Sequence, residues 1–433
     1  FRQEMMDYYR FISKEVNVVG SNQREQFTIT KAEDGTVHVL VNKIDKDQAI
    51  ASKIYDRIFT PDVTNEVRLY GLNDDDRFII RGGSSPIKIR IIGGSGKDEF
   101  INEGTGGNVL VYDATFEENV LSGNTAGLVD KISGDPEINR YNRLGFKYNQ
   151  VTPGIGAGYN IDDGLFLGAQ FQATLQGFRK EPYSQRHFIR GIRALKTSSY
   201  RFKYEGDFIK IVGNHDLIVR ADVRAPVNVT NFFGIGNETV YDKSKPGGDR
   251  YYRTRYDIAD VSLMMRRQPQ SWMRVHYGAT FQHFKLDEKE NQGKIITEAD
   301  INGLDTLSLY QGKSYAGLHF KLDINNQNNR VLPSRGFVMD ANIRPLFGLN
   351  GQRTHNLVRA DFDMRLYASI FALPRIVVAT RLGYGRNFGK FEFPQAYYLS
   401  GTENLRGCRR DRFAGRTMFF NNTEVRFRIA NFN

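Results

Sequence analysis

The stretch LGAQFQATLQ (residues 167–176) alternates apolar residues with glycine, glutamine and threonine. Successive side chains of a β-strand point to opposite faces of a sheet, so this alternation predicts a strand with one apolar and one polar face. The stretches AGLHFKLDI (residues 316–324) and VRADFDMRL (residues 358–366) alternate in the same way, with charged residues on the polar side. These stretches predict that the chain is built from long amphipathic strands.

Stretches of this kind follow one another as hairpins, and we count about twelve predicted strands. They cover residues 143–160, 163–177, 186–195, 199–210, 214–225, 251–267, 271–286, 309–326, 336–347, 354–370, 375–389 and 415–430. Many are longer than the usual five or six residues, and they lack the short spacing of a soluble β-sandwich, which is the alternative. The pattern favours a transmembrane antiparallel β-barrel with lipid outside and a charged, hydrated lumen.

The connections between these strands alternate in length, as outer-membrane barrels require. Short turns are predicted at residues 267–271, 332–335 and 372–375, and long loops at residues 226–250 and 287–307. On this count the polar segment YYLSGTENLRGCRRDRFAGR (residues 397–416) joins the eleventh and twelfth strands on the long-loop side. Loops of this length are usually functional or disordered, and we expect this one to fold back into the barrel.

The composition excludes several classes of protein. Aromatic residues make up 12% of the 433 residues, with 31 Phe, 22 Tyr and 42 Gly, a mixture that favours strands and tight turns. The net charge is +11, but Lys and Arg alternate with apolar residues along the whole chain, so we expect no nucleic-acid partner. No run of about 18 apolar residues is present, which excludes a transmembrane helix. The single cysteine, Cys408, cannot form an internal disulfide.

The first third of the chain has a different pattern. Residues 1–22 predict a helical lead-in whose apolar side chains share one face at helical spacing: Phe1, Met5, Tyr8, Tyr9 and Ile12. Residues 23–140 predict a small β-rich module that begins with a hairpin around the tight turn Asp34-Gly35. Residues 141–433 form the predicted barrel.

The β-rich module contains an internal repeat with a period of 22 residues. VRLYG (residues 67–71) is followed by Asp76 and Phe78, and IRIIG (residues 89–93) is followed by the equivalent Asp and Phe. A strand, a glycine turn, an Asp and a Phe, repeated, are typical of a small β-solenoid. GTGGNVLVYD (residues 104–113) is a candidate third coil.

The second repeat includes GGSGKDEFI (residues 93–101), which matches a calcium-binding nonapeptide. Carboxylate oxygens are the ligands that a hard cation prefers, so Asp76 and Asp98 are candidate calcium ligands. The alternative is a metal-free coil in which each Asp stabilises the turn. We prefer that alternative, because calcium-binding rolls repeat the nonapeptide several times.

We find no pattern that predicts enzymatic chemistry within this chain. The stretch GIGAG (residues 154–158) opens no helix, so it does not predict a dinucleotide site. His276 and His283 are seven residues apart on a predicted strand and point to opposite faces, which excludes a shared metal. The sequence contains no visible nucleophile–base–acid set.

Two segments near the end of the chain contain sequence motifs that resemble those of a known family. They are Leu405-Arg406-Gly407 followed by Arg412-Phe413, and Thr423-Glu424-Val425-Arg426 on the next predicted strand. GIGNE (residues 234–238) and LPSRGF (residues 332–337) add to them. With these segments, residues 141–433 resemble the BamA/TamA family of outer-membrane proteins, also called bacterial surface antigens.

The resemblance implies a barrel of about sixteen strands, so we expect the remaining C-terminal strands outside this sequence. It also implies that the arginine loop enters the lumen, where its arginine pairs with a carboxylate on a neighbouring strand. The strand phase places Glu424 on the lumen side, which makes it the candidate partner of Arg406. Cys408 stands where the family usually has an aromatic residue.

The resemblance implies a role in inserting or translocating other proteins, in the outer membrane of a Gram-negative bacterium. Its partners would be outer-membrane lipid and client proteins, and a client strand would add to an exposed barrel edge. Two alternatives stay open. The chain is the membrane anchor of an upstream periplasmic hydrolase, such as a metallophosphoesterase, or it is a diffusion porin for solutes.

Overall fold

The computed structural model describes the whole chain except residues 48, 161–162, 299–307, 371–374, 402 and 428–433. The chain divides into two compact units, Phe1–Phe146 and Lys147–Asn433. Among the described residues, no helix is long and apolar enough to cross a membrane.

The first unit begins with helix α1 (Arg2–Ile12), which is shorter than predicted. Strand β1 (Glu15–Val19) follows almost at once, where the sequence predicted helix up to residue 22. Its valines alternate with other residues, and Val18 enters the core with 2% of its surface exposed. The prediction of helix beyond Ile12 is therefore wrong, because strand pairing and burial of valine outweigh the helical spacing.

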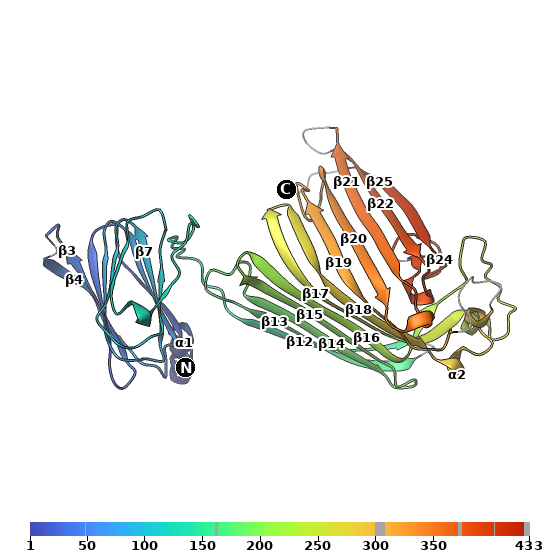
Figure 1. Cartoon of the computed structure of the whole chain (residues 1–433), viewed down its shortest axis with the longest axis horizontal. Helices are drawn as coiled ribbons and strands as arrows, with labels where there is room; N and C mark the ends of the chain where they lie inside the picture. The colour runs from blue at the N-terminus through green and yellow to red at the C-terminus, as the bar shows by residue number, and fades with distance from the viewer. Residues whose placement is uncertain (48, 161–162, 299–307, 371–374, 402, 428–433) are drawn as a thin grey trace. The chain divides into compact units, whose positions relative to one another are not determined.

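Two sheets pack face to face in the rest of this unit (Figure 1). Their further strands are β2 (Glu25–Lys31), β3 (Val37–Ile44), β4 (Ile50–Phe59), β5 (Glu66–Asn73), β6 (Arg77–Gly82), β7 (Lys88–Ser95), β8 (Glu99–Asn102), β9 (Val109–Tyr112), β10 (Val120–Gly123) and β11 (Leu128–Asp130). One sheet has the order β1-β5-β7-β9-β11, and the other has the order β10-β8-β6-β2-β3-β4. The predicted hairpin is β2-β3, and Gly35 in its turn has a φ of 83°.

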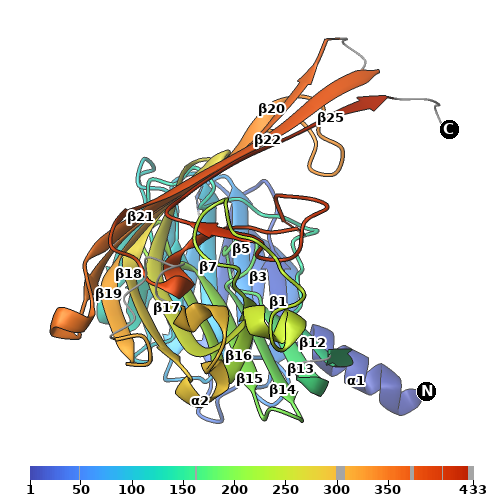
Figure 2. The same ribbon diagram turned by 90° about the vertical axis from the view of Figure 1, so that its right-hand side faces the viewer.

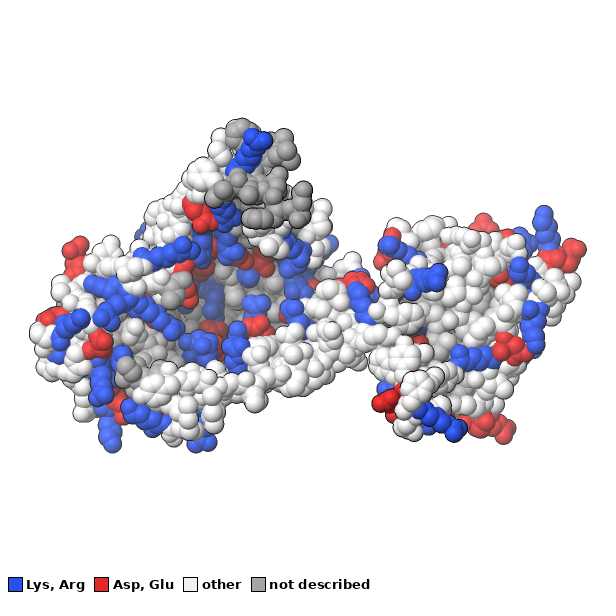
Figure 3. All heavy atoms as spheres, turned by 180° about the vertical axis from the view of Figure 1, so that it is seen from behind, with Lys and Arg blue, Asp and Glu red and all other residues white. Residues whose placement is uncertain are grey.

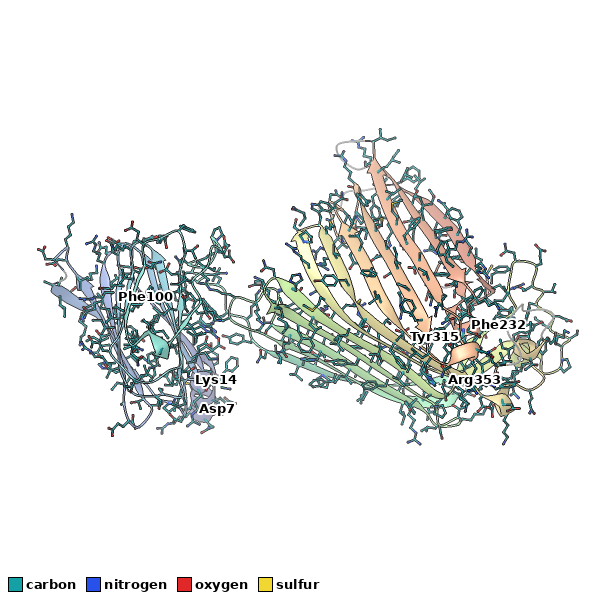
Figure 4. All side chains as sticks on the ribbon, viewed as in Figure 1. Asp7, Lys14, Phe100, Phe232, Tyr315 and Arg353 are labelled. Atoms are coloured by element: carbon teal, nitrogen blue, oxygen red, sulfur yellow. The ribbon has the colours of Figure 1, made fainter. Side chains whose placement is uncertain are left out.

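The 22-residue repeat is confirmed as a set of stacked coils. Val67 of β5 lies opposite Ile89 of β7, and Phe78 of β6 lies opposite Phe100 of β8, both in parallel pairs. The predicted third coil supplies β9, which pairs with β7. Phe27, Phe78 and Phe100 stack at the centre of the core, with ring centroids 4.7 and 5.3 Å apart (Figure 4 labels Phe100). The repeated Phe of both repeats therefore lies in the core, beside aliphatic residues of the same coils.

The second unit is a curved antiparallel sheet of twelve strands (Figure 2). Its strands are β12 (Gln150–Asn160), β13 (Gly164–Leu175), β14 (Gln185–Ala194), β15 (Tyr200–Val212), β16 (His215–Asn231), β17 (Arg253–Gln270), β18 (Met273–Leu286), β19 (Lys313–Asn325), β20 (Gly336–Gly348), β21 (Leu357–Ser369), β22 (Ile376–Gly389) and β25 (Thr417–Phe427). Each strand pairs with the next one in the list, so the twelve predicted strands are confirmed. Within the described residues, β12 and β25 are the two edges of the sheet.

Short elements lie in the connections. They are η1 (Thr125–Gly127) in the first unit, and η2 (Gly248–Tyr252), α2 (Glu288–Asn291), η3 (Ile295–Thr297), η4 (Gly351–Arg353), η5 (Phe393–Gln395), β23 (Tyr397–Leu399) and β24 (Phe413–Gly415) in the second. β23 and β24 pair with each other inside the connection between β22 and β25, and the sequence pattern did not predict them.

The two faces of the large sheet differ in chemistry. Directly opposed residues of neighbouring strands share a face, so the register assigns each side chain. Asp361 and Asp363 of β21 lie opposite Gly385 and Gly383 of β22, and we call their face the inner face. Figure 3 shows Lys and Arg, with Asp and Glu between them, gathered in the hollow of this unit. Ion pairs join these charges across strands, as between Arg381 and Asp363 (2.6 Å).

The opposite, outer face is apolar and exposed. Ile155, Tyr159 and Phe419 are 95%, 73% and 63% exposed, and comparable side chains follow on the other strands. Exposed apolar area costs about 25 cal/mol per Å² in water. An apolar face of this extent marks a surface that contacts lipid or another protein.

Candidate functional site

The connection between β22 and β25 (residues 390–416) folds back over the inner face of the sheet. It starts with η5, whose Glu392 and Gln395 side chains form a capping box, and it continues through β23 and β24. The loop joins β22 and β25, the eleventh and twelfth strands of the large sheet. We call residues 390–416 the inner loop.

Polar contacts attach the first part of the inner loop to the wall of the sheet. Lys313 at the start of β19 forms an ion pair with Glu392 (Nζ to Oε1, 2.7 Å), and Lys313 is 1% exposed. The Gln395 amide donates to Gln282 Oε1 on β18 (3.1 Å). The Asn387 amide donates to the Gln395 carbonyl (2.9 Å). The pair of Lys313 and Glu392 is therefore an ionic contact inside a buried polar network.

The next part of the loop rests on β21 and β22. Tyr397 donates its hydroxyl hydrogen to Asp361 Oδ1 (3.0 Å), and the Arg359 guanidinium lies 4.9 Å from the centre of its ring. A Cβ on Gly385 would lie 2.6 Å from the Tyr397 ring, so glycine is what lets the ring approach the wall. Arg381 donates to the carbonyl of Glu403 further along the loop (2.7 Å).

A second loop, residues 232–252 between β16 and β17, covers the inner loop at the same end of the sheet. The backbone N–H of Gly236 donates to the Ala414 carbonyl (2.8 Å), and Ile235 forms an isolated parallel bridge with Ala414. The two loops share an aromatic cluster, in which Phe393 packs edge to face on Phe232 (5.0 Å between ring centroids). Figure 4 marks Phe232 at this end of the sheet. The GIGNE segment thus lies against the strand that begins at Phe413.

Within the predicted motif, the side chain of Arg412 is held in place by contacts with the covering loop. Its guanidinium donates to Thr239 Oγ1 (2.8 Å) and to the Thr239 carbonyl. It also lies over the rings of Phe413 and Phe233, at 4.4 and 5.3 Å from their centres. Arg412 and Phe413 therefore join the inner loop to the covering loop.

The predicted contact between Arg406 and Glu424 does not form. Leu405 is half-buried, but Arg406, Gly407 and Cys408 are exposed at the loop tip, where Gly407 has a φ of 88°. Glu424 is on the inner face as predicted, opposite the buried Ala379, yet its carboxylate accepts a hydrogen bond from Arg426 of its own strand (2.8 Å). The face was predictable from strand phase, whereas the partner depends on where the tip of the loop lies.

We expect Arg412→Ala to lower the free energy of unfolding of the second unit by about 1.5–3 kcal/mol, the usual range for hydrogen bonds from a charged group. Arg406→Ala is the matched control and should change it by less than about 0.5 kcal/mol, since its side chain is exposed. Denaturant unfolding in detergent measures both. A larger effect at Arg406 than at Arg412 would reverse this assignment.

The candidate calcium ligands lie in the first unit, in a row of side chains that follows the stacked coils. The backbone N–H of Glu25 donates to Asp76 Oδ1, and that of Asp76 donates to Asp98 Oδ1 (2.8 Å each). The backbone N–H of Asp98 donates to Asn119 Oδ1 (3.1 Å). We call Glu25, Asp76, Asp98 and Asn119 the carboxylate ladder.

This arrangement does not support the calcium prediction. Among the described residues, no group of three or more His, Cys, Asp or Glu side chains is arranged to hold a metal ion. Asp76 and Asp98 are 2% and 0% exposed, and Asp76 Oδ2 is buried without a hydrogen-bond partner. Burial raises the pKa of Asp76 to about 9 and that of Asp98 to about 8. Bound protons thus keep the Asp76 and Asp98 carboxyl groups neutral near neutral pH.

Gly93 lies directly against this ladder. A Cβ at Gly93 would be 2.1 Å from Asp113 Oδ2 and 2.3 Å from Asp98 Oδ2, closer than real side-chain contacts. We expect Gly93→Ala to destabilise the first unit by about 1–3 kcal/mol through overpacking. At Gly83 a Cβ would meet nothing within 4 Å, so Gly83→Ala should change stability by less than about 1 kcal/mol. Equal losses in urea unfolding would contradict this account.

Sequence reasoning missed the residues that hold the inner loop. Lys313, Glu392, Gln282 and Gln395 carry no local motif, and each looks like an ordinary solvated polar residue in the sequence. They become functional candidates only because the loop brings β18, β19 and η5 together. The FEFPQ stretch (residues 391–395), in which Pro394 follows an acidic cap, was the one usable signal of a capped turn.

Comparisons with known proteins give one family and a set of distant structures. The model of the Omp85 superfamily domain matches residues 191–432. BamA from Haemophilus ducreyi lacking POTRA domains 1–3 aligns over 67% of this chain and 50% of its own, with 16% identity and a TM-score of 0.41. CdiB from Acinetobacter baumannii aligns over 65% of this chain and 46% of its own, with 14% identity and a TM-score of 0.34. The chain thus spans about half the length of these structures. No curated protein sequence matches it.

Proposed function

Since the chain belongs to the Omp85 superfamily, we propose that it works in the outer membrane of a Gram-negative bacterium as a protein-insertion or translocation factor. Its partners are outer-membrane lipid and client proteins that are themselves membrane-inserted or secreted. The chain itself carries no enzymatic step in this proposal. It lets a client strand pair with the barrel on its way into or across the membrane.

The outer face of the sheet supports the membrane location. Its apolar side chains are exposed in the isolated chain, with Ile155 and Phe419 among the most exposed. Lipid removes this area from water, whereas the charges on the inner face need a hydrated lumen. We assign the twelve strands to a barrel wall within residues 141–433.

The short turns give the orientation. The chain enters β12 at Gln150, at the same end of the sheet as the two-residue turn between β15 and β16. Short turns of outer-membrane barrels face the periplasm, and long loops face outward. We therefore assign residues 23–140, with the helical lead-in before them, to the periplasm.

One observation carries the insertion function: the model of the Omp85 superfamily domain matches residues 191–432 of this chain. In the mechanism that we propose, a client strand adds to an edge of the barrel sheet. An edge strand presents backbone N–H and C=O groups that can pair with another strand. Pairing through backbone groups accepts clients of many sequences, which suits an insertion factor. The inner loop lies across the lumen side and opposes free diffusion, so it favours this function over that of a porin.

The test uses the purified chain in liposomes with a urea-denatured outer-membrane barrel as client. We expect client insertion, read from heat-dependent gel mobility, to be faster than in liposomes that contain an unrelated barrel of similar size. Ion conductance of the same liposomes distinguishes an insertion factor from a porin, which would give a high steady conductance. Client insertion at the rate of the control liposomes, together with high steady conductance, would overturn the proposal.

A further inference from the structure

A polar pocket of about 300 Å³ lies on the inner face of the large sheet, the face that borders the hollow in Figure 3. Phe188 lies directly opposite Gln172 on one side and Glu205 on the other. Glu205 in turn lies opposite Arg220. The lining comes from four successive strands: Gln172 (β13), Arg186 and Phe188 (β14), Lys203, Glu205 and Asp207 (β15), and Arg220 (β16). The register thus gathers charges of both signs around one aromatic ring.

The two carboxylates of the pocket already have partners. Glu205 forms an ion pair with Lys203 of its own strand (2.6 Å). Asp207 accepts hydrogen bonds from the Arg186 guanidinium (3.0 Å) and from the Tyr183 hydroxyl (2.9 Å). Both acidic groups are therefore satisfied by contacts that leave out the arginine of β16.

Two arginines at the pocket have no carboxylate partner among the described residues. Arg220 is exposed and forms no hydrogen bond or ion pair with any of these residues. Arg190 lies opposite Lys203 and donates to Gln170 Oε1 (2.8 and 3.3 Å), which is a neutral acceptor. The Arg190 guanidinium also lies 5.2 Å from the centre of the Phe188 ring. Arg190 is thus held at the pocket by neutral groups, and its charge is not compensated.

The pocket therefore has a surplus of positive charge. Its four cations are Arg186, Arg190, Lys203 and Arg220, and its two carboxylates balance only two of them. The next carboxylate, Asp222, lies opposite Lys203 but is paired with Arg201 and Arg224 (2.8 and 2.9 Å). The surplus of two positive charges is thus open to an anion from solution.

A phosphate monoester fits this surplus better than a carboxylate does. A phosphate monoester has about −1.5 to −2 charges at pH 7 and three strong acceptor oxygens, whereas a carboxylate has a single charge. The planar guanidinium of arginine binds phosphate oxygens through parallel hydrogen bonds. A volume of about 300 Å³ is at the lower end of the range for small-molecule pockets, so the ligand is small.

We propose that this pocket binds the phosphate group of a small, water-soluble phosphate monoester, with Arg190 and Arg220 as its main ligands. The inner face borders a hydrated lumen, whereas lipid headgroups belong to the outer side of the wall, so the ligand comes from solution. The site goes beyond the proposed function, because neither insertion nor translocation of a client requires a phosphate ligand.

The experiment is calorimetric titration of the full chain in lipid nanodiscs with glycerol 3-phosphate, in a buffer without phosphate. We expect Arg190→Gln and Arg220→Gln each to weaken binding at least about fivefold, because each removes a charge-assisted hydrogen bond. Arg274→Gln is the matched control. Arg274 is exposed on the same face, opposite Asp323 of β19, and has no partner among the described residues, but it lies outside the pocket. Its variant should bind the ligand like the unchanged chain.

Glu205→Gln should have the opposite effect and tighten binding several-fold. The substitution removes a negative charge that repels the ligand, and it frees Lys203 to contact the phosphate. A purely structural role of this ion pair would give no such gain. Glu424→Gln is the matched control, since Glu424 also lies on the inner face but belongs to β25.

Two further ligands test the chemical class. Acetate should bind at least about tenfold more weakly than glycerol 3-phosphate, because it has a single charge. Phosphatidic acid added to the nanodisc lipid should not compete, and competition would overturn the assignment to a soluble ligand. Equal binding of acetate would overturn the preference for phosphate.

The site itself is overturned by either of two results. One is the absence of glycerol 3-phosphate binding at millimolar concentration. The other is an equal loss of binding in Arg274→Gln and Arg220→Gln. The client-insertion assay contains no phosphate ester, so its result is independent of this site, and either proposal can fail while the other stands.

Discussion

Lys313→Met should lower the free energy of unfolding of the second unit by about 3–5 kcal/mol, the usual cost of leaving a buried charge without its partner. Lys313 is 1% exposed and its ion-pair partner Glu392 is 12% exposed. Methionine fills most of the same space but leaves the Glu392 carboxylate buried and unpaired. Because Glu392 caps η5, we also expect the inner loop to leave the wall and become sensitive to trypsin at its arginines.

The double variant Lys313→Met with Glu392→Gln is the first control for this prediction. It removes both charges, so most of the lost stability should return. Lys147→Met is the second control, because Lys147 and Glu181 form an exposed ion pair, which is worth less than about 1 kcal/mol. Denaturant unfolding in detergent and limited trypsin digestion provide the two readouts. A loss below about 1 kcal/mol for Lys313→Met, with a protected loop, would show that the pair does not hold the loop.

The first unit should lose stability as the pH rises from about 4 to about 9. Asp76 and Asp98 have pKa values of about 9 and about 8 in the fold, where burial is the largest cause and neighbouring carboxylates add to it. Their ordinary pKa is 3.8. The folded state therefore keeps protons that the unfolded state releases. The resulting contribution to the free energy of unfolding is complete below about pH 4 and is lost as the pH rises past the folded pKa values.

Asp98→Asn should remove part of this pH dependence and stabilise the unit at pH 8. A difference of one between the folded and unfolded pKa of a group corresponds to about 1.4 kcal/mol, so the gain should exceed that amount. The substitution suits the site, because Asn119 already occupies the next step of the carboxylate ladder and accepts the same kind of backbone hydrogen bond. Amide hydrogen exchange of residues 66–112 in the full chain, corrected for intrinsic rates, gives the readout.

Several carboxyl groups surround Asp76 and Asp98, so the control for this prediction must be a carboxyl group outside this cluster. Asp76 faces Glu25, Asp74 and Asp98, and the Asp98 carboxyl faces Asp113. Asp34→Asn is the matched variant, because Asp34 lies in an exposed turn away from the ladder. Its exchange profile should keep the full pH dependence. A first unit that is equally protected at pH 5 and pH 9, or one that calcium protects at pH 8, would contradict the protonated ladder.

The strands were predictable because their signal is local. A residue and its neighbours at every second position settle which face is apolar, and this alternation runs through β13, β19 and β21 without interruption. The coils of the first unit were predictable because the repeat of 22 residues brings equal residues into register, as with Phe78 and Phe100. The end of helix α1 was not predictable. Strand β1 is so short that its valines fit the helical spacing as well as the alternation of a strand.

The contacts of the candidate site were not predictable, because they join segments far apart in the chain. Glu392 finds Lys313, and Arg412 finds Thr239, only after both loops have folded over the sheet. The sequence placed Glu424 on the correct face but gave it the wrong partner. Strand phase defines a face, whereas the position of a loop tip such as Arg406 depends on packing along the whole loop.

The most direct test of the account is a cysteine scan along β21 in outer-membrane vesicles, with Cys408→Ser as background. We expect a water-soluble thiol reagent to label Arg359→Cys, Asp361→Cys and Asp363→Cys, whose positions face the lumen. It should leave Val358→Cys, Ala360→Cys and Phe362→Cys unlabelled, because these positions face lipid. Equal labelling of the two sets would contradict the assignment of this sheet to a membrane barrel wall.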